Sequence, residues 1–132
     1  MHLIVCVDER DGMHFAGKRL SYDRKLVQFL LEYTQGTSLW MNRYSAKLFE
    51  GADIVVEEDI LGKTPDGAYC LLENTPFSQI SNLESVTLCQ WNRCYPSTEK
   101  FPRVLLSGMQ LENSCDFPGN SHEKITVERY IR

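Results

Sequence analysis

Short apolar runs separated by polar segments dominate the pattern of this sequence. The runs lie at residues 3–7, 38–41, 53–56, 68–72 and 85–91. Continuous apolar runs of this length are typical of strands that are buried on both faces of a parallel sheet. The pattern therefore predicts a central sheet that begins with a strand at 3–7.

In the segment 20–34 polar residues separate the apolar ones, which therefore do not form one continuous run. Apolar residues recur there at helical spacing from Leu26 to Tyr33, and this spacing predicts an amphipathic helix. Because the helix lies between the first two predicted strands, the three elements predict a strand–helix–strand crossover, which is the usual connection between parallel strands.

The rest of the chain completes an α/β pattern. Loops and turns are predicted at 8–19, 63–67, 93–102 and 117–119. A short helix is predicted at 43–49, and a short helix or an irregular link at 76–83. A further strand is expected within 104–112, and the alternating segment 122–131 predicts a last strand that pairs antiparallel with it. We therefore predict an α/β fold in a single domain, residues 1–132, with a mixed, mostly parallel central sheet, a few flanking helices and an antiparallel C-terminal strand pair.

Composition narrows the range of partners. The chain has 132 residues, of which 42% are hydrophobic, and this is enough for one core without metal or disulfide bonds. Its net charge of −4 disfavours nucleic acid as a partner. Its five cysteines form no C-x-x-C pair, so neither a disulfide framework nor a zinc site is indicated. Without a signal peptide or a long apolar run, we expect a cytoplasmic protein that binds neither nucleic acid nor membrane.

The sequence favours neither a metal site nor a nucleophile. The histidines His2, His14 and His122 lie far apart, whereas binuclear zinc hydrolases need an H-x-H-x-D-H cluster. The acidic run at 57–59 is interpreted as a solvated edge. No G-x-S-x-G elbow supports nucleophilic catalysis. His122, which the last strand is expected to bring beside the first, is interpreted as a structural or surface residue more readily than as a functional one.

Asp23 is the unusual residue of the predicted helix. It lies three and four positions before Leu26 and Val27, on a stripe that should be apolar, and a buried charge requires a partner or a ligand. One interpretation is an aspartate of the first turn, near a Ser21 cap, that the helix dipole stabilises. The other is an anchor for a ligand. The pattern alone leaves both open.

The order of several short motifs resembles that of the dihydrofolate reductases. A strand leads to a loop bracketed by glycines, and Leu20-x-x-Asp23 then opens a helix. Met41-x-Arg43-x-Ser45 follows at the end of the next strand. The resemblance implies a dihydrofolate-reductase-like fold and hydride transfer from NADPH to a small pterin-like or other heteroaromatic substrate.

The same resemblance extends to the C-terminal part and implies roles for individual residues. The segment 86–91, the pair Phe101-Pro102 and the pair Ser121-His122 follow in the family's order. Asp23 matches the acidic residue that holds the pterin, so it is the implied catalytic residue. The implied substrate-binding residues are Asp23, Val7, Phe15, Leu26 and Val27. The implied cofactor-binding residues are Met13, Arg43, Tyr44 and Ser45.

The chain departs from the family at positions that contact the cofactor. Glu73-Asn74 stands where members usually carry two glycines, so a side chain would crowd the cofactor there and Glu73 would repel phosphate. The chain is also shorter between 57 and 68, where the adenosine-binding half would be. Two hypotheses follow: a diminished NADPH-dependent reductase, or a non-catalytic module that binds a small-molecule ligand or a protein. The sequence does not indicate an oligomeric state.

Overall fold

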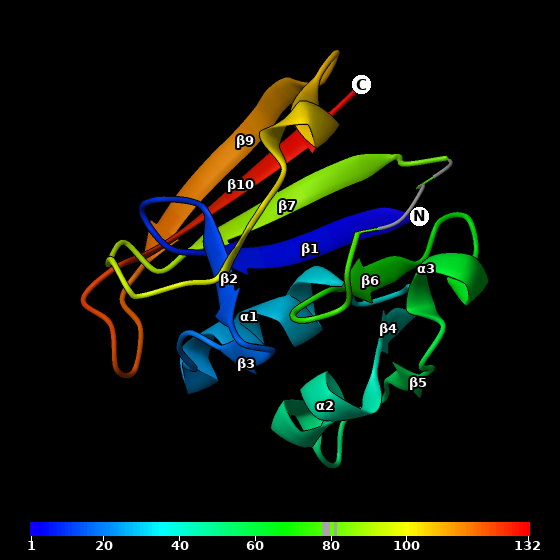
Figure 1. Ribbon diagram of the computed structural model, residues 1–132. Coiled ribbons are helices and arrows are strands. Elements are labelled where there is room, and N and C mark those ends of the chain that lie inside the picture. Colours follow the sequence, from blue (N-terminus) through cyan, green and yellow to red (C-terminus); the bar gives the residue numbers. More distant parts are fainter. Residues whose placement is uncertain (78–79, 81) are drawn as a thin grey trace.

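Residues 1–77, 80 and 82–132, which the computed structural model describes, form a seven-stranded sheet with the order β5-β4-β6-β1-β7-β10-β9 (Figure 1). The strands are β5 (Val55–Val56), β4 (Leu39–Met41), β6 (Tyr69–Leu71), β1 (His2–Val7), β7 (Ser85–Gln90), β10 (Ile125–Ile131) and β9 (Gln110–Phe117). The first five run parallel, and β10 pairs antiparallel with both β7 and β9. The predicted α/β fold with an antiparallel C-terminal pair is confirmed.

β1 is the centre of the hydrophobic core. It lies between β6 and β7, and successive side chains of a strand point to opposite faces of the sheet. Leu3 and Val5 accordingly belong to one hydrophobic cluster, whereas Ile4 belongs to a second cluster, and all three are fully buried. The prediction of a first strand buried on both faces is confirmed.

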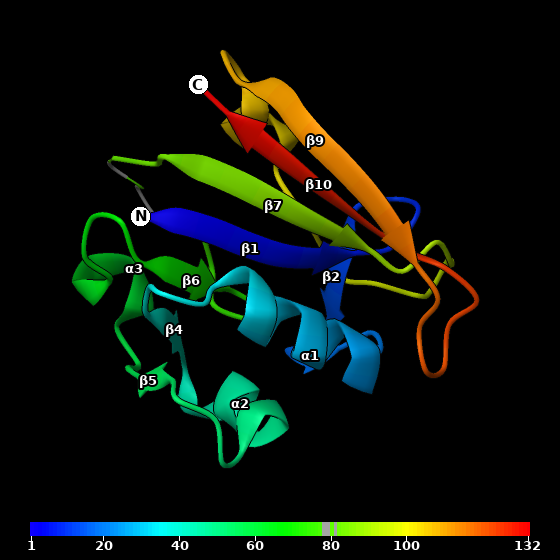
Figure 2. The same ribbon diagram turned by 180° about the vertical axis from the view of Figure 1, so that it is seen from behind.

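Different elements cover the two faces of the sheet. Helix α1 (Arg24–Tyr33) lies across one face and buries Leu26 and Leu30 in the second cluster (Figure 2). On the other face, Met13 and Phe101 pack against the first cluster from segments that cross in front of the sheet in Figure 1. No helix in the part of the chain that the structure describes is long and apolar enough to cross a membrane.

The helix begins later than the pattern predicted. Asp23 is the N-cap of α1, with extended backbone angles of φ −150° and ψ 124°, and its side chain accepts a hydrogen bond from the N–H of Lys25. An N-cap residue must leave the helical conformation so that its side chain can reach the first free N–H groups. Asp23 is therefore not a residue of the first turn, and Ser21 does not cap the helix.

The predicted loop at 8–19 is wrong, because it contains the hairpin of β2 (Gly12–Phe15) and β3 (Lys18–Arg19). Ala16 and Gly17 form its two-residue turn with positive φ angles of 48° and 82°, as a tight hairpin turn requires. β8 (Glu99–Lys100), within the second predicted loop at 93–102, pairs with β2 to complete a small three-stranded sheet.

The short helical elements agree only in part with the prediction. They are α2 (Arg43–Ala46), η1 (Lys47–Phe49), α3 (Ile60–Lys63) and η2 (Arg103–Leu106). The first two confirm the helix predicted at 43–49. η2 occupies the start of 104–112, where a strand was expected, because Pro102 just before it favours a helical turn, and the strand begins only at Gln110. The predicted link at 76–83 includes residues 78, 79 and 81, which lie outside the described residues.

Candidate functional site

Two carboxylates, Asp23 and Glu73, line one small cavity between the sheet and α1. Glu73 follows the carboxyl end of β6, the edge where ligands bind in open α/β sheets. The cavity has a volume of about 20 Å³, and its other walls include Cys6, Leu26 and Trp91. A space of this size holds roughly one water molecule, since one water needs about 10–15 Å³.

Every acceptor position of the Asp23 carboxylate is used by the protein itself. Oδ1 accepts from the N–H groups of Lys25 at 2.8 Å and Asn120 at 2.9 Å. Oδ2 accepts from the N–H of Ser121 at 2.9 Å and from Nδ1 of His122 at 2.8 Å. An ionised carboxylate offers about four lone-pair positions. Asp23 is only 1% exposed, so none is available to a ligand in this structure.

The surroundings keep Asp23 ionised. Burial by itself raises the pKa of this carboxyl, but hydrogen bonds from Asn120, His122, Ser121 and Lys25 outweigh it and hold the pKa well below its usual range. An ionised carboxylate can only accept hydrogen bonds. Nδ1 of His122 therefore carries the proton that faces Asp23, and in the neutral ring Nε2 is left as an acceptor.

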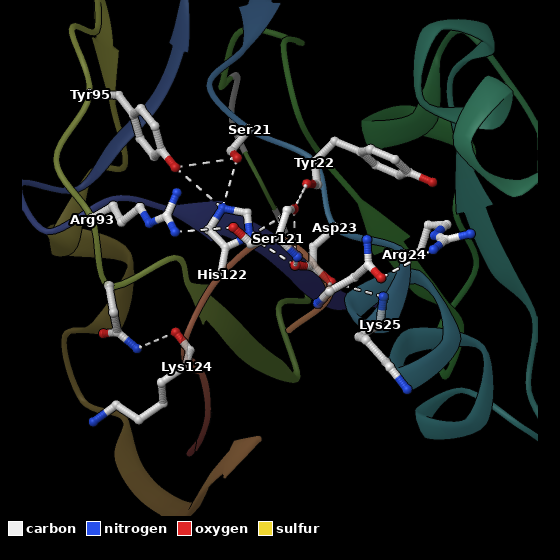
Figure 3. Close-up of polar contacts among 12 residues, drawn as sticks. Ser21, Tyr22, Asp23, Arg24, Lys25, Arg93, Tyr95, Ser121, His122 and Lys124 are labelled. Carbon is white, nitrogen blue, oxygen red and sulfur yellow. Dashed lines mark hydrogen bonds and ion pairs between the residues drawn. The ribbon is translucent and has the colours of Figure 1, made fainter. Parts of the chain in front are cut away.

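His122 connects Asp23 to a hydroxyl group. Its Nε2 lies 2.8 Å from Oγ of Ser21, and the Tyr95 hydroxyl lies 3.2 Å from Nε2 and 3.3 Å from that Oγ (Figure 3). The ring stacks on Trp91 with 4.7 Å between centroids. Ser21 is half-buried, whereas the His122 side chain is 1% exposed. We name Ser21, Asp23, His122 and Tyr95 the Asp23 cluster.

A glycine lets the β9–β10 connection approach Asp23 closely. A Cβ atom at Gly119 would lie 2.5 Å from Oδ2 of Asp23 and 2.9 Å from the backbone oxygen of His122. The N–H of Gly119 donates to that same oxygen at 3.0 Å and closes the turn. The connection therefore wraps the carboxylate with backbone donors that a larger residue at 119 would push away.

Glu73 is held by a second set of internal contacts. Nε and Nη2 of Arg19 each donate to its carboxylate at 2.9 Å, and the Ser45 hydroxyl donates at 2.8 Å. The guanidinium also lies over the ring of Tyr44, 4.2 Å from its centroid. Burial by itself lowers the pKa of Arg19, but its contacts with Glu73 outweigh this and raise the pKa. We name Arg19, Tyr44, Ser45 and Glu73 the Glu73 cluster.

The predicted cofactor residues are only partly brought together. Tyr44 and Ser45 meet in the Glu73 cluster. Arg43 is exposed, and its backbone N–H donates to the carboxylate of Glu58 at 2.7 Å. Met13 is buried in the hydrophobic cluster on the face of the sheet opposite α1. The start of α2, which carries three of the implied cofactor-binding residues, thus already has a carboxylate of the protein beside it.

The predicted substrate residues also divide into two groups. Leu26 and Val27 line the small cavity together with Asp23, as expected. Val7 points into the core on the opposite face of the sheet. Phe15 lies on the hairpin and is 51% exposed. The structure therefore places a compact apolar wall beside Asp23 and puts the other two residues elsewhere.

Comparison with known proteins bears on the fold. No protein-family profile and no curated protein matches the sequence. Among solved structures, a dihydrofolate reductase from Enterococcus faecalis, complexed with NADP(H) and RAB-propyl, superposes with a TM-score of 0.64. The match covers 99% of this chain and 95% of that chain at 13% sequence identity. The chain has a dihydrofolate-reductase-like fold. Identity this low establishes the fold and no more.

This dihydrofolate-reductase-like fold has a larger cleft that the sequence did not predict. It has a volume of about 390 Å³ and lies between β2, the segment 74–77 and the segment around β8. Its lining residues are Met13, His14, Asn74, Thr75, Pro76, Phe77, Glu99, Lys100 and Pro102. Ligand pockets in proteins commonly have volumes of roughly 300–1,000 Å³. Of the two sites, the cleft has the room for a small organic molecule.

Little in the sequence indicated the Asp23 cluster. Asp23 and His122 are 99 positions apart, and Ser21 and Tyr95 are 74 positions apart. No short motif contains such a pair, and only the unusual charge at Asp23 pointed to the place. Within the described residues, no group of three or more histidine, cysteine or acidic side chains is arranged to hold a metal ion.

Proposed function

We propose that this chain is a ligand-binding module on a dihydrofolate-reductase-like scaffold, which binds a small heteroaromatic molecule and transfers no hydride from a nicotinamide cofactor. The observation that carries the proposal is the pairing of Arg19 with Glu73. Both oxygens of the carboxylate are bonded within the protein, and its side chain is 9% exposed. The guanidinium of Arg19, which lies beside Ser45 and Tyr44 of the expected cofactor site, is therefore already neutralised.

The residues around that site do not fit a cofactor diphosphate. The carboxylate of Glu58 lies at the start of α2, so phosphate would face a like charge there, and the hydroxyl of Ser45 is already bonded to Glu73. Like charges about 4 Å apart repel by on the order of 1–4 kcal/mol near a protein surface. Asn74 adds a side chain where the backbone would have to approach the cofactor, and its amide is already bonded to the oxygen of Gly17 at 3.0 Å.

The larger cleft supports the ligand class. It presents an aromatic ring at Phe77, an imidazole at His14 and an ammonium group at Lys100. A flat ring with polar edges suits such a lining, because its faces contact apolar surface while its edges form hydrogen bonds. The anchoring and catalytic role predicted for Asp23 stays a prediction, and it would require the β9–β10 connection to release the carboxylate.

Equilibrium titration tests the proposal. Folic acid, as a pterin probe, and NADPH are each titrated into the native chain by isothermal calorimetry. We expect micromolar binding of folic acid and no heat from NADPH up to millimolar concentration. Phe77→Ala should weaken folic acid at least tenfold, because it removes aromatic contact from the cleft. Phe15→Ala is the matched control, since this phenylalanine is exposed on the hairpin. Micromolar binding of NADPH, or equal effects of both variants, would overturn the proposal.

The second candidate is a diminished NADPH-dependent reductase. The likeness to a dihydrofolate reductase that was complexed with NADP(H) favours it. It would require Arg19 to exchange Glu73 for a phosphate group. Loss of NADPH absorbance in the presence of dihydrofolate, abolished by Ser45→Ala, would support this candidate over the first. If neither NADPH nor folic acid binds, the protein-interaction alternative is tested by pull-down.

A further inference from the structure

Ser21, His122 and Asp23 are linked in the order that serine hydrolases use. Oγ of Ser21 lies 2.8 Å from Nε2 of the imidazole, and Nδ1 lies 2.8 Å from Oδ2 of the aspartate (Figure 3). Such a triad is recognised by its geometry and roles, and it recurs on unrelated folds in different chain orders. We propose that Ser21 is a nucleophile and that this chain hydrolyses small esters by acyl transfer.

Asp23 has the properties of the positioning residue. It is ionised and fully buried, and it fixes the Nδ1–H tautomer of His122, so that Nε2 faces the hydroxyl of Ser21. Backbone donors of Asn120 and Ser121 hold the carboxylate in place. In a site from which water is excluded, such fixed hydrogen bonds stabilise the imidazolium that forms during reaction.

The ring of His122 is held for proton transfer. Trp91 stacks on one face with planes inclined by 23°, and the side chain is 1% exposed. A general base must lie within about 2.6–3.2 Å of the oxygen whose proton it removes, and the 2.8 Å separation between Nε2 and Oγ of Ser21 meets this condition. His122 is therefore placed as the base for Ser21.

The surroundings of Ser21 indicate a small acyl group. Ser21 is half-buried and lines the cavity of about 20 Å³, whose walls include Leu26, Val27 and Trp91. Space for roughly one water-sized group suits the methyl group of an acetyl ester and excludes longer chains. The hydroxyl of Tyr95, 3.3 Å from Oγ of Ser21, is a donor that could stabilise the oxyanion.

The reaction balances with an ester and water. Oγ of Ser21 bonds to the carbonyl carbon while its proton passes to Nε2 of His122. The bond from that carbon to the leaving oxygen then breaks, and the Nε2 proton goes to the departing alcohol. Water attacks the acetyl-serine and gives a proton to Nε2, and Ser21 leaves with that proton as acetic acid is released.

Covalent labelling of the native chain tests the nucleophile without any substitution. The protein is treated with an alkyl fluorophosphonate, which phosphonylates activated serines, and the adduct is located by mass spectrometry. We expect the label on Ser21. Ser114, which is exposed on β9, should remain unlabelled and serves as the internal control. Labelling of neither serine, or of both equally, would overturn the proposal.

Steady-state hydrolysis gives the second readout. With p-nitrophenyl acetate, Ser21→Ala should lower kcat/KM at least a hundredfold, whereas Ser114→Ala should leave it unchanged. Asp23→Asn should lower kcat by about 10²–10⁴-fold with little change in KM, since it disturbs the tautomer of His122. The butyrate ester should react at least tenfold more slowly than the acetate. If Ser21→Ala hydrolyses p-nitrophenyl acetate as fast as the native chain, the reaction is ordinary surface reactivity and the proposal is overturned. The fluorophosphonate experiment uses the native chain, so its result stands even if Asp23→Asn fails to fold.

Discussion

The Asp23 cluster and the Glu73 cluster each compensate the charge of a carboxylate that has little contact with water, but they do so with different partners. Each holds a carboxylate in a poorly solvated place at the same cavity. Glu73 is balanced by a full charge, the guanidinium of Arg19, which remains 22% exposed. Asp23 is balanced mainly by backbone donors and by His122, whose side chain is 1% exposed. One carboxylate is thus neutralised, and the other keeps its charge directed at an imidazole.

The two clusters therefore differ in whether the carboxylate is connected to a group that can take part in proton transfer. In the Glu73 cluster Arg19 and the hydroxyl of Ser45 both donate to the carboxylate, and Arg19 also bonds to Tyr44, so these contacts connect the carboxylate to no titratable ring of the imidazole type. In the Asp23 cluster they continue through His122 to the hydroxyl of half-buried Ser21. A buried charge that is fully paired is a structural feature, whereas one that orients a titratable ring can support chemistry.

Asp23→Asn should lower the free energy of unfolding by about 2–4 kcal/mol, because the new amide group would face donors that now bond to the carboxylate. Urea denaturation measures the change. Glu112→Gln is the control, since the side chain of Glu112, which pairs with Arg129, is 42% exposed, and a pair screened by water in this way is worth about 1 kcal/mol or less. A variant as stable as the native chain would favour the alternative that Asp23 is a strained anchor for a ligand.

Glu73→Gln should cost less, about 1–3 kcal/mol, because the guanidinium of Arg19 is partly exposed and regains contact with water. A double-mutant cycle with Arg19→Met isolates the pair and should give a coupling energy of about 1–2 kcal/mol. If the two variants are additive within about 0.3 kcal/mol, the pair does not hold this site closed.

Acid should distinguish Asp23 from an ordinary surface carboxylate. The folded chain holds the pKa of Asp23 well below the ordinary value of 3.8, so between the two values the unfolded chain binds more protons. The stability that Asp23 contributes is therefore complete above about pH 4 and declines as the pH falls below it. Urea midpoints at pH 7, 4 and 3 should fall more steeply for the native chain than for Asp23→Asn. Parallel declines would show that Asp23 is not the group responsible.

Arg43→Ala should have the smallest effect, within about 0.5 kcal/mol, because the side chain is exposed on α2. It should also leave binding of folic acid unchanged, since Arg43 does not line the larger cleft. Thermal unfolding and the calorimetric titration check both outcomes. If Arg43→Ala instead weakens binding of NADPH, the reductase candidate gains over the ligand-binding module.

The sequence predicted the sheet well, because burial on both faces leaves a continuous apolar run. Leu3 to Val7 carry no polar residue, and the run marks the central strand at once. The hairpin at 12–19 was missed because its strands are short and its turn is Ala16-Gly17 rather than a more typical Asn-Gly pair. The start of α1 was placed early because Ser21 was considered as the cap and Asp23 takes that role.

The candidate site was less predictable than the fold. The charge of Asp23 could be recognised as unusual because it lies on an otherwise apolar stripe, and the structure shows that Asp23 pairs with His122. Its partners could not be predicted, because His122 is 99 positions away in the sequence. The close approach of the β9–β10 connection to Asp23 also depends on Gly119, which lies in an irregular segment. Arg19 and Glu73 are likewise 54 positions apart. Local periodicity reports burial along one element, and it contains no information about such distant polar pairs.

Nuclear magnetic resonance can detect the hydrogen bond by which Asp23 fixes the tautomer of His122. Long-range ¹H–¹⁵N correlation of the imidazole reports which nitrogen carries the proton. We predict that the neutral ring of His122 is protonated at Nδ1, with a strongly deshielded proton, and that Asp23→Asn removes this feature. A ring protonated at Nε2, or one that Asp23→Asn leaves unchanged, would show that Asp23 does not orient His122.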